Sequence, residues 1–286
     1  MKTRAARICL ASAVVMWAVS TQAGEPALEV LRVAGAVDHC PIGGFCGADA
    51  TCPAGLEIIG GGVAIVQGTL VSLEDNISFE VWYNQDGDAG AAAQAYALCA
   101  ATPAGFVQRD WPGQCADGEA FCTMDVECPL QTVALSAGIY ASRTRLMQLS
   151  PGEGRVWHFG WFEDGNGVRS SLWLHCASLP PGYEVIRGVA QSCAVGDTCS
   201  DEARCSDGKV LVGGGFDGAE SEIVTTAPAS TTTWHVAWRA AVQPFGDAAQ
   251  GLGQAVAVCA SGSGVDDPLH ASGFEPPLSL LTGTTP

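Results

Sequence analysis

Residues 40–62 read CPIGGFCGADATCPAGLEIIGGG, and the pattern in this stretch returns twice further along the chain. In each copy, five residues separate the second cysteine from the third, and a triplet of small residues begins eight positions after the third. The triplets lie at 60–62, 136–138 and 213–215. Self-similarity at a fixed period indicates that one supersecondary unit is used three times. We expect the glycines to mark a bulge or a close crossing of backbones.

Each copy continues with an alternating aromatic segment and ends on a cysteine followed by alanine. Apolar residues at every second position are typical of a strand with one buried face. The other apolar runs are short and separated by turn-forming clusters, and no segment has a helical period of useful length. The sequence therefore predicts an all-β fold: three tandem, disulfide-stapled antiparallel units of about 75 residues, with four to five strands each. The alternating positions are Phe79, Val81 and Tyr83; Trp157, Phe159 and Trp161; and Trp234, Val236 and Trp238.

The three predicted units span residues 24–101, 102–178 and 179–260. Each opens with an apolar segment that carries an arginine, at Arg32, Arg109 and Arg187. The links between units are short, so we expect the units to pack together. Residues 261–286 contain no cysteine and are rich in Gly, Ser and Pro, which predicts a flexible C-terminal tail.

The first 23 residues have the layout of a secretory signal peptide. Basic residues are followed by an apolar run over positions 8–19 and then by small residues, so we expect cleavage after Ala23. The run is too short to span a bilayer, and no later segment has the ~20 apolar residues that spanning requires. The sequence thus predicts a secreted or periplasmic protein without membrane insertion.

The part of the chain after the signal peptide contains 12 of the 13 cysteines. An even number of cysteines in an exported chain predicts a disulfide framework. A zinc site is a weaker explanation because the sequence contains no CxxC pair. Spacing alone leaves the connectivity open. The cysteines are Cys40, Cys46, Cys52, Cys99, Cys115, Cys122, Cys128, Cys176, Cys193, Cys199, Cys205 and Cys259.

The chain is strongly acidic, with 13 Lys and Arg against 30 Asp and Glu. Removal of the signal peptide takes away three basic residues and no acidic one, which changes the net charge from −17 to −20. Binding to nucleic acid requires a basic face, so nucleic acid is excluded as a partner.

Several motifs resemble those of secreted bacterial β-repeat proteins of unassigned activity. The resemblance rests on Cys-Pro-x-Gly at 52–55, Gly-Gly-Gly at 60–62, Trp82 and Cys99-Ala100, and most of these features return in the third unit. The middle unit departs from the pattern, with Ser136, Ala137 and Gln131 at three glycine positions. Short members of that family keep only the outer cysteines, which implies that the third cysteine pairs with the fourth. By symmetry alone, three such units also resemble β-prism proteins of the vitelline membrane outer layer type and some lectins, which implies a pseudo-threefold arrangement.

Glu80, His158 and His235 occupy the same register position in the three units, one residue after the first aromatic residue of each strand. If these three side chains pointed inward around a threefold axis, they would form a transition-metal site. Alternation argues against this, because the aromatic neighbours take the buried face. We therefore predict no metal site here.

No motif for catalysis or for cofactor binding stands out. Neither a phosphate-binding glycine loop nor a GxSxG motif is present, and the acidic turns at 86–88 and 163–166 do not complete a calcium loop. The sequence therefore predicts no catalytic residue and no cofactor.

Four tryptophans lie on the alternating positions and are predicted to be core residues. Trp82, Trp111 and Trp173 lie off them, and if exposed they would stack on sugar rings or anchor a protein partner. The first hypothesis is therefore a secreted, non-catalytic binding or structural module that recognises glycan or an extracellular protein through repeated loops. The alternatives are an extracellular hydrolase that acts on a polymer with loop carboxylates, and a protease inhibitor that presents a rigid loop.

Overall fold

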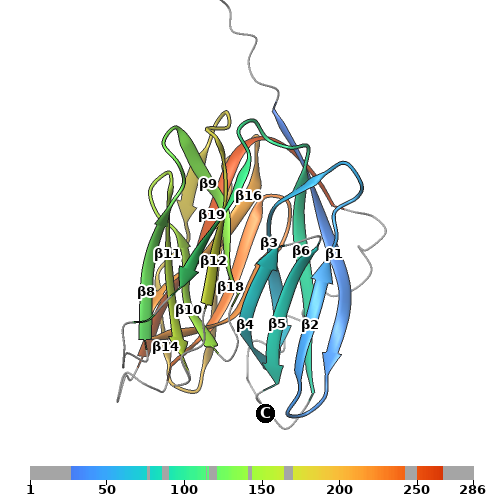
Figure 1. The fold of residues 1–286 in the computed structure, drawn as a ribbon. Coiled ribbons are helices and arrows are strands. Elements are labelled where there is room, and N and C mark those ends of the chain that lie inside the picture. The colour runs from blue at the N-terminus through green and yellow to red at the C-terminus, as the bar shows by residue number, and fades with distance from the viewer. Residues whose placement is uncertain are drawn as a thin grey trace, which may run out of the picture.

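The structure is a computed structural model, and it describes residues 27–75, 78–85, 90–113, 115, 121–140, 144–163, 170–241 and 250–266 (Figure 1). The predicted signal peptide lies outside these residues. The described chain is all-β, as the sequence predicts, and contains 19 strands. No helix among the described residues is long and apolar enough to cross a bilayer.

The strands of residues 24–101 form two layers of three strands. One layer has the order β1-β6-β3 and the other β2-β5-β4, and all neighbours within them are antiparallel. The bounds are β1 (Leu28–Cys40), β2 (Phe45–Ala50), β3 (Glu57–Val66), β4 (Gly68–Asp75), β5 (Phe79–Gln85) and β6 (Ala91–Ala100).

Residues 102–178 show the same order, with layers β7-β12-β9 and β8-β11-β10. The bounds are β7 (Val107–Gly113), β8 (Phe121–Glu127), β9 (Thr132–Tyr140), β10 (Thr144–Pro151), β11 (Val156–Glu163) and β12 (Ser170–Ser178).

Residues 179–260 differ in that the first strand is divided into β13 and β14, which both pair with β19. The layers are β13/β14-β19-β16 and β15-β18-β17. The bounds are β13 (Glu184–Arg187), β14 (Gln191–Ala194), β15 (Thr198–Arg204), β16 (Lys209–Ala219), β17 (Ser221–Pro228), β18 (Thr233–Ala240) and β19 (Gln250–Asp266).

The prediction of four to five strands per unit was wrong, because residues 24–101 and residues 102–178 form six strands each. One apolar run supplies two strands that lie in different layers. The chain passes from β3 to β4 through Gln67 and from β16 to β17 through Glu220. Both residues have a positive φ, 57° and 54°. A single residue in this left-handed region redirects the chain without the Gly or Pro cluster that marks a turn in a sequence.

The three sets of strands contact one another in a cyclic order. β3 pairs with β17 at Val63 and Thr226, and β16 pairs with β10 at Phe216 and Leu149. Between β9 and β4, the hydroxyl of Ser72 donates a hydrogen bond of 2.8 Å to the carbonyl of Ile139. In each contact the third strand of one set meets the fourth strand of another. A pseudo-threefold axis stays a prediction that these contacts favour.

The small-residue triplets lie where these strands approach most closely. A Cβ atom on Gly60 would lie 2.6 Å from the carbonyl oxygen of Val212, and one on Gly213 would overlap the carbonyl of Leu135. A Cβ atom at Gly62 would overlap the carbonyl of Thr226. The close crossing that the triplets predict is therefore confirmed, and a bulge accompanies it between Ile58 and Gly60.

Two of the three arginines near the start of a unit, Arg32 and Arg187, reach across to a neighbouring set of strands, whereas Arg109 is exposed on β7. Arg32 on β1 donates from Nε to the carbonyl of Pro228, the last residue of β17, over 2.8 Å. Its guanidinium also lies 4.4 Å from the ring centre of Tyr96. Arg187 on β13 donates from Nη2 to the carbonyl of Pro151, at the end of β10, over 3.2 Å.

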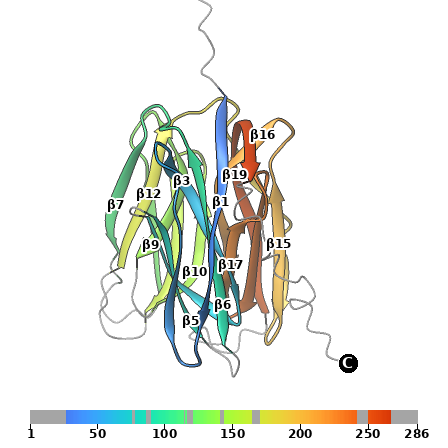
Figure 2. The same ribbon diagram turned by 90° about the vertical axis from the view of Figure 1, so that its right-hand side faces the viewer.

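One strand pair is parallel, and it joins the first set of strands to the third, whereas the neighbours within each set are antiparallel, as the sequence predicts. β1 runs alongside the end of β19, with Leu28 opposite Gly262 and Arg32 opposite Asp266 (Figure 2). Residues 261–266 therefore belong to this strand and not to a tail, because β1 offers their backbone groups a ladder of hydrogen bonds. The rest of the predicted tail lies outside the described residues.

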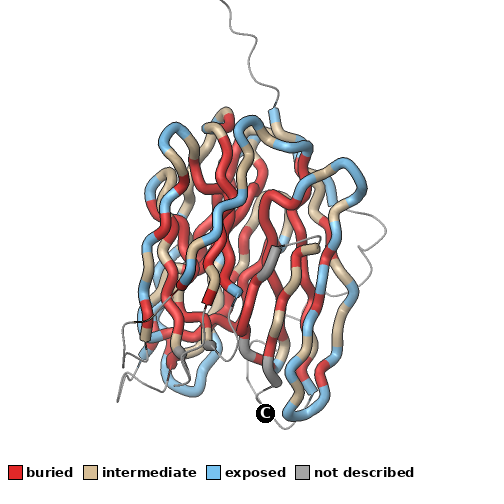
Figure 3. The backbone as a smooth tube through the Cα atoms, viewed as in Figure 1, coloured by how far each residue is buried: buried red, intermediate tan, exposed pale blue. Residues whose placement is uncertain are grey.

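The core runs between the layers, and Figure 3 shows buried backbone along the inner strands and exposed backbone at their ends. The four tryptophans on alternating positions, Trp157, Trp161, Trp234 and Trp238, are at most 1% exposed, which confirms the prediction for them.

Six disulfides join the 12 described cysteines. Their Cα atoms are 5.7 Å apart in five of the six pairs, within the usual range for such a bond. The third cysteine pairs with the fourth in each set, as the resemblance implies. So many disulfides are typical of proteins that fold in an oxidising compartment. The pairs are Cys40–Cys46, Cys52–Cys99, Cys115–Cys122, Cys128–Cys176, Cys193–Cys199 and Cys205–Cys259.

Candidate functional site

Of the three tryptophans off the alternating positions, Trp173 is an internal packing residue. It is 4% exposed, and its indole Nε1 donates a hydrogen bond of 2.9 Å to the carbonyl of Leu73 on β4. The ring also meets Phe79 edge to face, with centres 6.4 Å apart. Trp173 thus joins β12 to the first set of strands and is not available to an external ligand.

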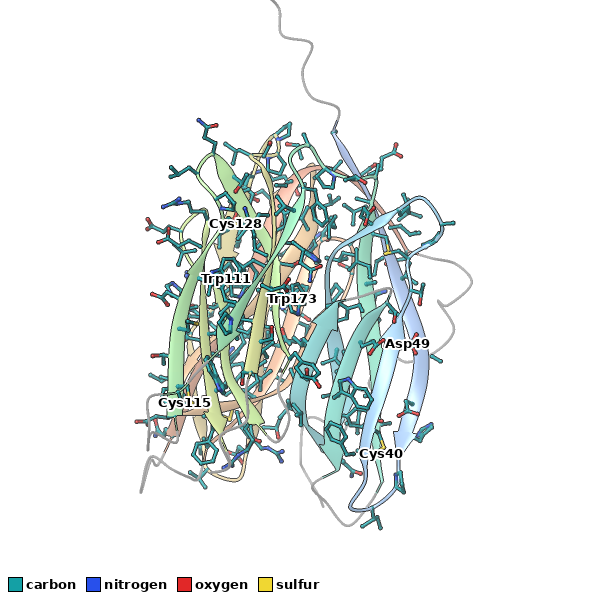
Figure 4. All side chains as sticks on the ribbon, in the orientation of Figure 1. Cys40, Asp49, Trp111, Cys115, Cys128 and Trp173 are labelled. Carbon is teal, nitrogen blue, oxygen red and sulfur yellow. A yellow bond between two sulfur atoms is a disulfide. The ribbon has the colours of Figure 1, made fainter. Side chains whose placement is uncertain are left out.

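Trp111 is a half-buried residue on β7, an outer strand of its layer. It lies opposite Leu172 in the β7–β12 pair, and Leu172 is fully buried. Since directly paired residues project to the same face, the indole packs against the core. Figure 4 shows Trp111 and Trp173 on neighbouring strands, well away from Asp49 on β2.

Trp82 lies on an open face of the layer β2-β5-β4. Its neighbours Val81 and Tyr83 are fully buried, so alternation turns the indole outward. There it stacks on Phe45 of β2, with ring centres 5.2 Å apart and planes 10° from parallel. Phe45 is 53% exposed, whereas every other phenylalanine and tryptophan among the described residues is at least partly buried.

Gly47 makes room for the indole. It lies directly opposite Trp82 in the β2–β5 pair, and a Cβ atom there would lie 3.3 Å from two carbon atoms of the indole, Cε3 and Cζ3. The ring therefore rests over a stretch of bare backbone. We define Phe45, Gly47 and Trp82 as the aromatic platform.

Two carboxylates lie next to the aromatic platform on the same face. Asp49 and Glu80 are directly opposite each other, two pairs further along the strands than Gly47 and Trp82, and therefore on the same face. The hydroxyl of Ser78 donates a hydrogen bond of 3.3 Å to Glu80. Within the described chain, Asp49 has neither a hydrogen bond through its side chain nor an ion pair.

The disulfide Cys40–Cys46 and the buried residues beneath hold this surface in place. Cys46 directly follows Phe45, and its bridge ties β2 to the end of β1. Below the face, the hydroxyl of the buried Tyr83 donates to Asp38, 3.0 Å from Oδ2. Burial and this carboxylate raise the pKa of Tyr83 well above its usual range, so the phenol remains a hydrogen-bond donor. These two links attach both β2 and β5 to β1.

Glu80, His158 and His235 lie on β5, β11 and β18, in three different layers, and each contacts a partner on an adjacent or the same strand. His158 Nδ1 lies 2.7 Å from Asp125 Oδ1, and His235 Nδ1 lies 3.6 Å from Glu202 Oε1. Among the described residues no three His, Cys, Asp or Glu side chains meet as a metal site would require.

His235 is the more buried of the two histidines, with 13% of its side chain exposed against 36% for His158. Burial lowers the pKa of His235, and the nearby carboxylates of Glu202 and Asp201 oppose this effect without reversing it. At neutral pH the imidazole is therefore uncharged.

A cavity of about 690 Å³ lies at another place, where the start of β1, the two links between units and the end of β19 converge. Its wall is mainly aliphatic, from residues such as Leu28, Leu56 and Val265. Glu29 supplies the one carboxylate among the described lining residues. None of the described residues that line the cavity is aromatic, in contrast to the aromatic platform.

The remaining predictions about chemistry stay untested. The acidic turn at 86–88, and residues 164–166 of the second turn, lie outside the described residues.

The sequence analysis named Trp82 as a candidate binding residue and considered Glu80 only for a metal site that it rejected, and it did not consider Phe45 or Asp49. Both sit on β2, and only the register of β2 against β5 brings them to Trp82 and Glu80. One signal was available: Phe45, Gly47 and Asp49 alternate with small residues that suit a buried face. The chain matches no protein-family model and no curated protein sequence.

Proposed function

We propose that the protein is an exported, non-catalytic glycan-binding protein and that the aromatic platform, with Asp49 and Glu80, is its binding surface. The observation that carries the proposal is the stack of Phe45 on Trp82 on an open sheet face. Export is supported by the layout of residues 1–23 and by the six disulfides.

The chemistry of the surface suits a sugar. A pyranose ring presents a face of C–H groups, which packs on an aromatic ring, and a rim of hydroxyls, which donate hydrogen bonds to carboxylates. Both kinds of group lie side by side here, because Trp82 and Glu80 are two residues apart on β5 and therefore project to the same face. Cross-links that hold a surface in one conformation reduce the conformational entropy lost on binding, which favours affinity.

A glycan fits this surface better than a protein does. A stable protein interface buries about 800 Å² on each partner around an apolar centre. The exposed apolar groups of the platform are limited to two rings, with carboxylates directly beside them.

The test is a glycan array followed by titration calorimetry on the glycans that bind. W82A should weaken binding at least tenfold, which is about 1.4 kcal/mol, and W82F should restore part of it. F45A should also weaken binding. Failure of the protein to bind any glycan, or unchanged binding by W82A, would overturn the proposal.

A matched control is available in the second set of strands. Phe121 occupies the position of Phe45, directly before the second cysteine, but faces Gly160 where the first set has Trp82. F121A should therefore leave glycan binding unchanged. Release of reducing ends from a bound glycan would show that the protein is a hydrolase and contradict the non-catalytic part of the proposal.

A further inference from the structure

We infer that the aromatic platform selects sugars that carry a positive charge, namely amino sugars with a free ammonium group. The inference rests on the proposed function and specifies its ligand class. The carboxylates of Asp49 and Glu80 would bind the ammonium group while Trp82 stacks on the sugar ring.

The first argument is the pairing of two like charges. In an antiparallel sheet, directly opposite residues have Cβ atoms about 5 Å apart, and like charges at such positions destabilise the sheet. Asp49 and Glu80 stand in this relation. Ser78 donates a hydrogen bond to Glu80, but no cation among the described residues contacts either carboxylate.

The second argument comes from the other two sets of strands, where the equivalent pair consists of an acid and a histidine. Asp125 lies opposite His158 on β8 and β11, and Glu202 lies opposite His235 on β15 and β18. Both pairs are in contact, at 2.7 Å and 3.6 Å. In the first set, Glu80 takes the place of the histidine, so the acid has no imidazole opposite it and an ammonium group of a ligand would occupy that place between the two carboxylates.

The third argument is the charge of the surroundings. Residues 24–101 contain ten Asp and Glu but one basic residue, Arg32. Arg32 is engaged elsewhere, with the carbonyl of Pro228 and with Asp266. The potential around the platform is therefore negative, which attracts cations and repels acidic sugars.

The aromatic rings support the same ligand. An ammonium group near the face of a tryptophan is attracted by the negative quadrupole of the ring. Trp82 is the only indole beside the carboxylate pair within the described chain. An acetylated amine keeps the shape of the sugar and loses the charge, so it forfeits both attractions.

The experiment compares glucosamine oligomers with N-acetylglucosamine oligomers of the same length by titration calorimetry. At about pH 6 the free amines are largely protonated. The deacetylated oligomer should bind at least tenfold more tightly in about 0.05 M NaCl. This ratio should shrink in about 0.5 M NaCl, since salt screens exposed charges.

Two variants and one control identify the groups responsible. D49N should bring the ratio of the two affinities towards one. E80H, which recreates the acid–histidine pair of the other sets, should do the same. D125N removes the matched acid on β8 and should leave the ratio as in the wild type.

The outcomes separate the inference from the proposed function. If the acetylated oligomer binds as tightly as the deacetylated one or more tightly, the inference is wrong and glycan binding stands. If neither these oligomers nor any glycan on the array binds, both are wrong. If lysine-rich peptides bind in a Trp82-dependent way and sugars do not, the platform recognises protein and both are again wrong.

Discussion

The hydroxyl of Ser136 on β9 donates a hydrogen bond to the carbonyl of Ile59 on β3, over 2.7 Å. Ser136 occupies the position that Gly60 and Gly213 hold in the other two sets of strands. Its Oγ also lies 3.1 Å from Nδ1 of His175. The single hydrogen of the Ser136 hydroxyl is used in the bond to Ile59, so Nδ1 of His175 would be the donor in this second contact. The departure from glycine in the middle unit is therefore a polar link between two sets of strands.

S136A should destabilise the protein by about 1–3 kcal/mol, because it leaves the buried carbonyl of Ile59 without this donor. Urea unfolding monitored by tryptophan fluorescence measures the effect. Thr123 lies on the exposed face of β8, so T123A is a suitable control and should change the free energy of unfolding little. Equal stability of S136A and wild type would show that the hydrogen bond contributes nothing.

G213A should be more harmful, because the added methyl group overlaps the carbonyl of Leu135, a backbone atom that cannot rotate away. Overpacking of this kind typically costs about 1–3 kcal/mol and sometimes more. At Gly160 the nearest atom to such a methyl is Cβ of Gln148, 3.1 Å away, and a side chain can adjust. Thermal unfolding should therefore show a larger loss for G213A than for G160A, and the reverse order would contradict the close crossing.

The disulfides should differ in their contribution to stability. Cys52–Cys99 spans 47 residues and Cys40–Cys46 spans 6. In the loop-entropy treatment, removal of the first costs about 4 kcal/mol and removal of the second about 2 kcal/mol. Double Cys-to-Ala variants of each pair, compared by urea unfolding, test this. A C40A/C46A variant less stable than C52A/C99A would indicate that strain or packing outweighs loop closure.

R32A should lower stability by about 2 kcal/mol, since a charged donor to the carbonyl of Pro228 and a contact with Tyr96 are both lost. Arg155 provides the comparison. It pairs with Glu127 at the surface, where ion pairs contribute about 0–1 kcal/mol. R155A should therefore unfold close to wild type, and if both variants lose the same stability, Arg32 does not link the units as described.

Acid should weaken the fold in part through His235. Its pKa in the folded protein lies below the ordinary value of 6.5, mainly because of burial. As the pH falls through about 6.5, the unfolded chain binds a proton more readily than the folded one. The contribution of His235 to stability is thus complete above pH 6.5 and is lost below it, down to the folded pKa.

H235Q should remove this part of the pH dependence, measured as the free energy of unfolding between about pH 7.5 and pH 5. T123A changes an exposed residue of β8 that does not titrate, so it should keep the slope of the wild type. A slope unchanged in H235Q would assign the acid sensitivity to other groups.

Local patterns were sufficient to predict much of the molecule. Alternation along single strands placed Trp157 and Trp234 in the core, and the spacing of cysteines indicated a disulfide framework, which the structure confirms. Such features depend on neighbours in sequence, so they are visible in the sequence itself.

Features that depend on distant parts of the chain could not be predicted. The partnership of Phe45 with Trp82 requires the register of β2 on β5, and the role of Trp173 requires the position of Leu73 in another set of strands. The parallel pairing of β1 with β19 joins segments more than 200 residues apart. No local pattern distinguishes a strand that finds such a partner from a tail.

The parallel pairing of β1 with β19 also affects the order in which strands can pair while the chain is synthesised. Leu28 to Arg32 are synthesised more than 200 residues before their partners at 262–266. Until then one side of β1 presents unpaired backbone groups, which invite association with other chains. We therefore expect a chain truncated before β19 to associate with other chains through this edge of β1, which residues 262–266 cover in the complete fold.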